Sequence, residues 1–461
     1  MNGSRVVVVG GGLAGLSAAL ACVDAGASVR LLERRPRLGG ATWSFERHGA
    51  WFDNGQHVFL RCCTAYRDFL ARIGASDGVV LQDRLSIPVV SPGRPVEVIA
   101  RDALPAPLHL ARTLLGYRHL TGPERWSAVR TALRLRRLDP DAPELDERSF
   151  GEWLASQGQS PRAVDGLWDL ICRPTLNLPS ADASLALAAM VFRTGLLSDS
   201  RAADIGYARV PLAALHAEPA ARALRAAGAS IHTDTPVVGI ARGVDGAVCG
   251  VDLDDGYVVA DAVVLAVPHR AAAALLPHGA VPDSDRLSEL GESPIVNVHV
   301  VFDRRVTELE LAAGVGTPVQ WVFDRTAASG IEEGQCLAVS LSAADEQIGR
   351  PAAELSGGIV DALRELFPPA RAARVVDTIV TREGAATFRA APGTRRLRPP
   401  ARTAVPGLYL AGAWTDTGWP ATMEGAVRSG TAAAAAVLAD VGAPSGAARA
   451  ARGPRREPVV A

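Results

Sequence analysis

Hydrophobic positions near the start of the chain follow the pattern of a buried strand, a helix and a second strand. Residues 6–9 are four consecutive valines, which is typical of a parallel strand buried on both faces. Residues 14–25 are predicted to form a helix that ends at Gly26, and residues 28–33 a second strand. This order predicts a βαβ unit at the amino terminus.

Glycines in the first turn of this unit predict a dinucleotide site. Gly10, Gly12 and Gly15 have the spacing G-x-G-x-x-G, and Glu33 follows Gly15 by eighteen residues. Glycines here allow a tight turn, a close approach to a pyrophosphate and tight packing of the helix, whose amide end faces the phosphates. Glu33 is then positioned to bind the ribose hydroxyls of an adenosine. A glycine-rich turn in an ordinary α/β domain would leave Glu33 unexplained, so we expect a nucleotide cofactor.

Composition is typical of a globular protein without affinity for nucleic acid. The chain has 461 residues, of which 48% are hydrophobic, enough to bury a large core and to form two domains. The formal net charge is −1, which gives no general attraction to nucleic acid. Neither a secretory signal nor a run long enough to span a bilayer is found, so a cytoplasmic location is expected.

Cysteine and lysine usage restricts the chemistry. The six cysteines show no CxxC spacing, so free thiols are expected and neither disulfides nor a metal site is predicted. The chain contains no lysine, and arginine supplies all 48 basic residues.

Two segments in the first half of the chain are predicted to be helical, residues 104–120 and 123–138. The second carries Trp126, Val129 and Leu133 on one side and several arginines elsewhere. Such a helix is either a solvated helix of the domain or a basic amphipathic helix on an anionic membrane surface. The sequence leaves both interpretations open. Peripheral contact with the inner face of the cell membrane is therefore one expectation.

Motifs at both ends of the chain carry a family resemblance. Residues 34–42 follow Glu33 and contain the double glycine Gly39–Gly40, and residues 407–414 and 422–427 lie near the other end. In this order they resemble the FAD-dependent amine oxidase and phytoene desaturase superfamily. The resemblance implies FAD as the cofactor, with the double glycine near the pyrophosphate and the carboxyl-terminal segments near the ribityl chain and the flavin ring.

Further segments narrow the resemblance. Residues 48–59, 174–179, 386–388 and 392–400 are similar to the squalene-associated FAD-dependent desaturases, better described as hydroxysqualene dehydroxylases. The similarity covers most of residues 5–438. It implies that reduced FAD replaces the hydroxyl of hydroxysqualene with hydride, giving squalene for hopanoid synthesis. The expected partners are this long isoprenoid, an external flavin reductant or reductase, and upstream enzymes of the squalene pathway.

The expected fold is α/β, a Rossmann-like FAD-binding domain with a discontinuous α+β substrate domain. Residues 231–240 and 260–268 are predicted to be buried strands of the first domain, with a turn at 254–256 between two further strands. The FAD-binding domain is expected to comprise residues 1–90, 205–274 and 401–441, and the substrate domain residues 91–204 and 275–400. Residues 442–461 are expected to be a disordered tail.

Candidate cofactor-binding residues come from the motif and from the resemblance together. Val237 is included because the resemblance implies a backbone contact to adenine from residues 236–238. The complete set is Gly10, Gly12, Leu13, Ala14, Gly15, Glu33, Arg34, Arg35, Gly39, Gly40, Ala41, Thr42, Gly55, Gln56, His57, Val237, Gly412, Ala413, Thr422, Met423 and Ala426.

A proton donor is expected beside the flavin, because hydroxide is a poor leaving group. The resemblance brings the segment after Gly55 close to the ring, so His57 is one candidate, although a lone histidine beside a buried strand is more often a core residue. Asp416 is the second candidate catalytic residue. Thr422 is expected to open a helix, either as a simple cap or with its dipole aimed at the flavin.

Two positions depart from the superfamily pattern. An arginine is common after the double glycine, where this chain has Ala41, and a Gly-Asp pair is expected where it has Gly412–Ala413. Both replacements remove a side chain that would bind FAD. Arg35 or Arg37 is expected to compensate at the phosphates, and Asp416 at the ribityl chain.

Other functions on the same fold remain as alternatives. Many amine oxidases place a lysine near the flavin and an aromatic residue before Met-Glu-Gly, whereas this chain has no lysine and has Thr422 at that position. A carotenoid or other isoprenoid desaturase fits better and is the second choice. A lipid-binding protein without catalysis would have no need of the glycine motif and Glu33.

Overall fold

A five-stranded parallel sheet forms the centre of the predicted FAD-binding domain. The computed structural model describes residues 3–282 and 284–442. Neighbouring strands follow the order β10-β2-β1-β14-β20, with parallel pairing throughout. Because β1 lies in the middle, all four of its valines are buried. The strands are β1 Arg5–Val9, β2 Ser28–Leu32, β10 Ser230–His232, β14 Ala262–Leu265 and β20 Leu408–Leu410.

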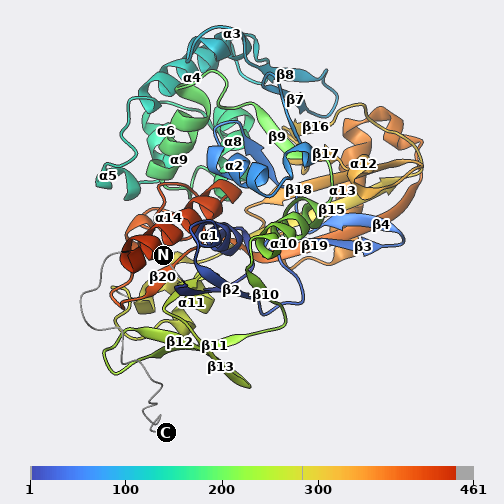
Figure 1. Cartoon of the computed structure of the whole chain (residues 1–461). Coiled ribbons are helices and arrows are strands. Elements are labelled where there is room, and N and C mark those ends of the chain that lie inside the picture. The colour runs from blue at the N-terminus through green and yellow to red at the C-terminus, as the bar shows by residue number, and fades with distance from the viewer. Residues whose placement is uncertain (1–2, 283, 443–461) are drawn as a thin grey trace.

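Helices cover this sheet, and the two faces of β1 enter different cores. Val6 and Val8 pack with residues of the helices, whereas Val7 and Val9 join the core that continues towards the rest of the molecule. A three-stranded antiparallel sheet extends the domain at its far end (Figure 1). The elements are α1 Leu13–Asp24, α2 Thr64–Arg72, α10 Glu218–Ala226, α11 His269–Leu275, α14 Met423–Gly442, β11 Val237–Arg242, β12 Val248–Leu253 and β13 Gly256–Val259.

A mixed seven-stranded sheet, in the order β19-β15-β18-β17-β16-β7-β8, lies in the predicted substrate domain. Helix α13 packs on it through Leu355, Ile359 and Leu363. The elements are β7 Ser86–Val90, β8 Glu97–Ala100, β15 Ser293–Phe302, β16 Leu311–Gly314, β17 Trp321–Asp324, α12 Thr326–Ser329, β18 Gln335–Ser342, α13 Ala352–Leu366 and β19 Val375–Thr387.

A group of short helices gathers at one end of the molecule, opposite β11–β13 (Figure 1). Its core contains aromatic residues in mutual contact, including Phe150, Trp168 and Phe192. The helices are α3 Ala111–Gly116, α4 Gly122–Leu135, α5 Pro143–Asp146, α6 Phe150–Ser156, α7 Pro161–Ala163, α8 Asp169–Leu176 and α9 Leu185–Phe192.

Small sheets connect the two domains. β5 pairs with β9, which also pairs with β6, and β3 forms a hairpin with β4. The strands are β3 Ser44–Arg47, β4 Ala50–Asp53, β5 Val58–Leu60, β6 Val79–Leu81 and β9 Ile205–Ala208. Among the described residues, no helix combines the length and the apolar content needed to cross a bilayer.

The structure confirms the predicted βαβ unit and corrects three other expectations. The strand expected at 231–240 is two strands in different sheets, β10 and β11, because the chain turns at Asp234 with φ 51°. The helix expected at 104–120 is confined to a short turn at 108–110 and α3, because Pro105 and Pro107 interrupt the segment. The boundary expected at residue 90 separates β7 from β8, yet these two strands pair with each other in one sheet. The tail was expected at residues 442–461, and all of it after residue 442 lies outside the described residues.

Candidate functional site

The glycine motif forms a cradle that side chains would close. Gly10 has φ +107°, and a Cβ there would lie 2.4 Å from the Ala266 carbonyl oxygen. Gly40 has φ +58°, and its Cβ would lie 2.8 Å from the Cα of Gly12. The first glycine loop and the double glycine therefore touch through backbone atoms. This arrangement leaves main-chain amides open to a ligand, as a pyrophosphate site requires.

Glu33 closes one side of the cradle. Its carboxylate accepts hydrogen bonds from the Gly11 amide at 2.6 Å and from the Arg35 amide at 2.9 Å, and only 8% of the residue is exposed. The Glu33 carbonyl oxygen accepts from the Thr235 amide at 2.9 Å, which brings the segment before Val237 to the same edge. The predicted acid therefore lies directly beside the glycine loop.

The amino terminus of α1 is free of side-chain capping. Its N-cap is Gly12, which has no side chain, so no protein side chain occupies the amides of Leu13 and Ala14. Such a helix end favours an anion through its amides and its dipole. The uncapped helix, the cradle and Glu33 together fit the pyrophosphate and ribose of a dinucleotide.

The arginines and Thr42 near the cradle differ in their exposure and in the groups that they contact. Arg34 and Arg35 are exposed. Arg37 stacks over the Trp43 ring at 4.1 Å, and burial, followed by the nearby Arg35 charge, lowers its pKa. The Thr42 hydroxyl donates to the Gly39 carbonyl oxygen at 2.9 Å, so this side chain braces the double-glycine turn.

Arg398, which the sequence analysis passed over, organises the carboxyl-terminal motif. This buried guanidinium donates to the carbonyl oxygens of Thr415 at 2.6 Å and Trp419 at 2.7 Å, and it also reaches Ala413. Burial lowers the Arg398 pKa to about 10, so the group remains charged at neutral pH. The residue stands in the Leu-Arg-Pro-Pro segment 397–400, the only signal in the sequence that marks it. Arg398 therefore holds the loop that follows Gly412.

Helix α14 begins beside this loop. The Thr422 hydroxyl accepts from the Gly425 amide at 3.1 Å, which confirms Thr422 as a cap. The Gly412 amide donates to the Ser429 hydroxyl at 2.8 Å, and that hydroxyl donates to the Ala426 carbonyl oxygen at 2.6 Å. These bonds fix Gly412 against the first two turns of α14.

A large apolar cavity of about 270 Å³ begins at the start of α14 and runs under the short helices. At the α14 end its walls include Gln56, Trp419, Thr422 and Met423. Aliphatic and aromatic side chains form most of the remaining wall. Among them are Ile87, Ile99, Leu110, Leu114, Ala128, Ala132, Leu167, Trp168, Ile171, Pro174, Val191, Phe192, Leu196, Ile205, Ile295, Trp321 and Phe323.

Two hydrogen-bond donors in this wall lack partners. Gln56 Nε2 and Trp321 Nε1 are buried, and neither atom has a partner among the described residues. Asn297 on β15 positions Gln56, because its side-chain oxygen accepts a hydrogen bond from the main-chain N–H of Gln56 at 3.4 Å. The sequence analysis missed Trp321 and Asn297, because both stand in ordinary apolar strands. The cavity wall is therefore mostly apolar, and two unpaired N–H groups are buried within it.

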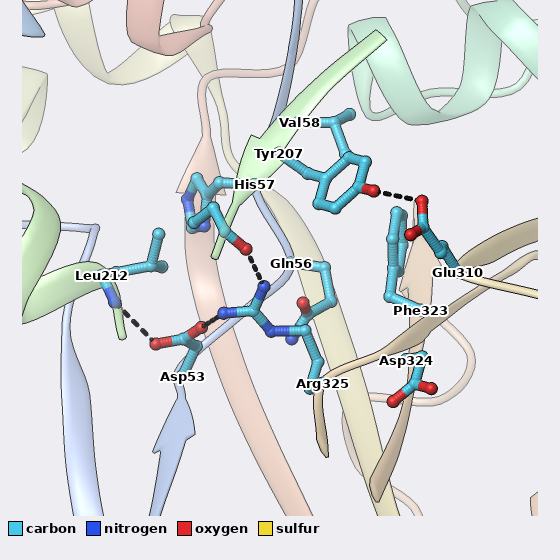
Figure 2. A pocket seen from close by; sticks show the side chains of 11 residues that line it. Asp53, Gln56, His57, Val58, Tyr207, Leu212, Glu310, Phe323, Asp324 and Arg325 are labelled. Carbon is cyan, nitrogen blue, oxygen red and sulfur yellow. Dashed lines mark hydrogen bonds and ion pairs between the residues drawn. The ribbon is translucent and has the colours of Figure 1, made fainter. Parts of the chain in front are cut away.

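His57 lies in a small, charged pocket of about 10 Å³ that shares Gln56, Val58 and Phe323 with the large cavity (Figure 2). Arg325 spans this pocket and pairs with Asp53 at 2.8 Å, and Asp53 also accepts from the Leu212 amide at 2.9 Å. His57 donates through Nδ1 to the Gly55 carbonyl oxygen at 3.2 Å. Asp53 thus joins β4 to the segments that contain Leu212 and Arg325.

The structure does not support His57 as a proton donor. Burial lowers its pKa, so the imidazole is neutral at pH 7 and lacks the acidic proton that the role requires. His57 is also absent from the residues that line the large cavity. It is better described as a packing residue of the charged pocket.

Asp416 does not reach the cavity either. It is exposed, and its carboxylate accepts from the Gly418 amide at 3.3 Å within its own turn. The backbone of Asp416 donates to the Pro399 carbonyl oxygen at 2.9 Å, which holds the residue on the outer side of the loop. The expectation of a catalytic Asp416 is therefore not supported.

Glu424 is a carboxylate in the cavity wall, and its role is structural. It accepts from the Tyr66 amide at 2.7 Å and the Ala65 amide at 3.2 Å, which caps α2, and it pairs with Arg428 at 2.7 Å. The Met-Glu-Gly motif therefore ties the first turn of α14 to the start of α2.

Comparison with known proteins agrees with this geometry. Residues 13–438 match the family model described as flavin containing amine oxidoreductase. The hydroxysqualene dehydroxylase of Rhodopseudomonas palustris is 30% identical, covering 94% of this chain and 98% of the relative, and that of Sinorhizobium fredii is 29% identical, covering 95% and 99%. The 15-cis-phytoene desaturase of Glycine max is 27% identical, covering 95% of this chain and 80% of the relative.

Solved structures show the same fold at low identity. An oxidoreductase from Methanosarcina mazei superposes with a TM-score of 0.72 at 20% identity, covering 92% of this chain and 98% of that one. A putrescine oxidase variant superposes with a TM-score of 0.71 at 21% identity, covering 95% and 99%. The match to the family model spans most of the chain and includes Glu33, the double glycine and the carboxyl-terminal motifs. The chain therefore belongs to the flavin containing amine oxidoreductase family, an enzyme family whose cofactor is FAD.

Proposed function

We propose that this FAD-dependent oxidoreductase removes the hydroxyl of hydroxysqualene reductively and releases squalene. The two hydroxysqualene dehydroxylases match this chain over 98% and 99% of their own lengths, whereas the match to the Glycine max desaturase covers 80% of that protein. End-to-end similarity at about this identity favours the first activity over the second.

The observation that carries the proposal is the chemistry of the large cavity. A long isoprenoid buries apolar surface there, worth about 25 cal/mol per Å². The unpaired Gln56 Nε2 and Trp321 Nε1 in its wall offer hydrogen-bond donors for a hydroxyl oxygen on that chain. A hydrocarbon such as phytoene leaves both donors unsatisfied, at a cost of about 1–3 kcal/mol each. The cavity therefore favours an isoprenoid alcohol.

We assign the cofactor residues by their position around the cradle. In this proposal, Gly10, Gly12, Leu13 and Ala14 face the pyrophosphate, and Glu33 holds the adenosine ribose. The double glycine with Ala41 and Thr42, the Gly412–Ala413 pair and residues 422–426 follow the cofactor towards the cavity. Ala41 and Ala413 offer no polar side chain to FAD, so in this proposal main-chain amides make the hydrogen bonds to the cofactor at these positions. Arg34 and Arg35 supply positive charge near the phosphates.

The chain's contribution to the reaction is orientation and exclusion of water. Bound reduced FAD supplies the hydride. The second hydrogen of the reduced cofactor balances the reaction, because the hydroxyl has to leave as water. Gln56 and Trp321 would orient the hydroxyl oxygen as neutral hydrogen-bond donors, and the apolar wall would keep bulk water away from the allylic cation. The electrons come from an external reductant or a reductase, since only one G-x-G-x-x-G motif is found in the sequence.

Product analysis tests the proposal. The purified protein is incubated anaerobically with photoreduced FAD and hydroxysqualene, and the extract is analysed by gas chromatography. Squalene is the expected product. A parallel sample holds oxidised FAD and phytoene, and a dehydrogenated product there without squalene in the first sample would support the isoprenoid desaturase instead.

Amines provide a second discrimination. A panel of primary and secondary amines is added anaerobically to the oxidised holoenzyme, and bleaching of the flavin absorbance is followed. We expect no bleaching, since the chain has no lysine and the cavity wall is apolar. Rapid bleaching by any amine would contradict an isoprenoid substrate.

A further inference from the structure

The outer surface of the short-helix group carries an unusual concentration of apolar side chains. Residues 94–137 contain β8, α3 and α4, which lie together at one end of the molecule (Figure 1). We call their exposed side the cap face. Most of the large hydrophobic side chains found exposed in the described chain belong to it, whereas the others are scattered over distant elements. Those of the cap face are Val96, Val98, Leu104, Leu108, Leu115, Trp126 and Leu133.

Helix α4 shows how this face is built. Trp126, Arg130 and Leu133 are exposed and follow one another at intervals of three or four residues, which places them on one side of α4. Arg137 is exposed in the turn that follows the helix. Trp126 is 62% exposed, which is unusual for so large an apolar side chain. The opposite side buries Ala128, Thr131 and Leu135. The outward stripe of α4 is therefore both apolar and basic.

Charge is concentrated on the same segment. Residues 94–137 include nine arginines and three acidic residues, although the whole chain has a net charge of −1. The guanidinium groups of Arg130 and Arg137 form no hydrogen bond or ion pair with another residue in the described part of the chain. Arg101 is buried and paired with Asp204, so it does not add to the surface charge. The remaining excess of positive charge around exposed apolar groups is complementary to an anionic lipid surface.

A surface groove lies between β8 and α3. Its walls include Arg94, Arg112 and Arg118 together with Val96 and Val98, and its volume is about 760 Å³. Thr113 lines both this groove and the large inner cavity, and its hydroxyl donates to the Ala100 carbonyl oxygen of β8. A single layer of residues thus separates the outer groove from the inner cavity.

Helices α3 and α4 line the inner cavity with their other sides, through residues such as Leu114, Ala128 and Ala132. We propose that the cap face docks on an anionic lipid bilayer. A bilayer in contact there would hold a dissolved isoprenoid next to the cavity wall. This last step rests on the proposed function, whereas the docking itself does not.

Vesicle sedimentation tests the docking with the holoenzyme alone. Vesicles consist of phosphatidylcholine, with or without phosphatidylglycerol. We expect partitioning into the anionic vesicles that weakens with salt. The double variant Arg130→Gln/Arg137→Gln should weaken it about 30-fold, about fivefold for each arginine. The double variant Trp126→Ser/Leu133→Ser should weaken it about tenfold or more through lost apolar insertion.

Matched controls lie on distant elements. Arg222→Gln/Arg225→Gln removes two arginines from exposed positions of α10, and Val244→Ser removes the side chain that is 89% exposed in the β11–β12 turn. Both controls should partition like the unmodified protein. Equal binding by all variants would overturn the proposal. Failure of the unmodified protein to bind anionic vesicles would also overturn it, and the cap face would then be a candidate site for a protein partner.

The two proposals fail separately. Turnover is also measured with hydroxysqualene in detergent micelles and in anionic vesicles. We expect the Trp126→Ser/Leu133→Ser variant to keep its rate in micelles and to lose it in vesicles. Vesicle binding without squalene formation would contradict the proposed reaction alone. Squalene formation in micelles by a protein that ignores vesicles would contradict the docking alone.

Discussion

At the scale of single residues, Glu33 shows how one carboxylate prepares a cofactor site. It holds the Gly11 and Arg35 amides and so fixes the loop before any ligand binds. Glu33→Gln should weaken FAD retention by about 10-fold to 100-fold, because a charged hydrogen bond contributes about 1.5–3 kcal/mol. The ratio of flavin to protein absorbance after gel filtration measures this. Glu46→Gln, an exposed position on β3, serves as the control, and an equal ratio in both variants would remove Glu33 from the site.

Trp321 tests the assignment of the substrate hydroxyl. Trp321→Phe deletes the unpaired Nε1 donor and keeps an aromatic ring in the cavity wall. We expect kcat/KM for hydroxysqualene to fall about 5-fold to 30-fold, since one hydrogen bond contributes about 1–2 kcal/mol, with FAD content unchanged. Trp51→Phe, at an exposed position of β4, should leave kcat/KM unaltered. Normal kinetics of the Trp321→Phe variant would exclude the Nε1 donor from substrate binding.

At the scale of elements, the contact between α1 and α14 determines where the cradle sits. A Cβ on Gly430 would lie 2.1 Å from the Ala14 carbonyl oxygen, so the two helices touch through their backbones. Gly430→Val should separate them, lowering the free energy of unfolding by about 1–3 kcal/mol and reducing FAD retention. Gly357→Ala in α13 is the control, since its Cβ would meet no atom within 4 Å. Denaturant unfolding compares the two, and retention of normal stability and FAD by Gly430→Val would show that the helices can move apart freely.

The elements also show what the sequence could predict. Strand β1, α1 and β2 were predicted within about a residue, because valine runs, glycine spacing and Glu33 are local signals. The division of 231–240 into β10 and β11 depends on pairing with β2 and β12, which lie far away in the chain. The site followed the same rule. Glu33 and Thr422 were identified by motif, whereas the cavity that excludes His57 and contains Trp321 exists only after β15, β17 and the short helices have assembled.

At the scale of the whole molecule, buried neutral histidines couple stability to pH. His299 donates through Nε2 to the Asp53 carbonyl oxygen at 3.0 Å, and burial lowers its pKa to about 4. The unfolded chain binds this proton at about pH 6.5, before the folded protein does. The free energy of unfolding should therefore fall by about 1.4 kcal/mol per pH unit per such histidine as the pH drops from 6.5 towards 4.

Urea unfolding at several pH values measures this slope. His299→Gln should reduce the slope of unfolding free energy against pH by about 1.4 kcal/mol per pH unit, the contribution of one proton. His278→Gln, at an exposed position, should leave the slope unchanged. An identical slope in the two variants would show that His299 is not held neutral by the fold.

In the proposed reaction, the reduced holoenzyme delivers its electrons to hydroxysqualene in the large cavity. An anaerobic single-turnover experiment tests this most directly. The FAD of the purified enzyme is photoreduced, hydroxysqualene is added, and the recovery of oxidised-flavin absorbance is followed together with squalene by gas chromatography. We predict recovery of the absorbance with about one squalene formed per flavin, as a two-electron reaction requires. A flavin that stays reduced, with hydroxysqualene recovered unchanged, would contradict the proposed function.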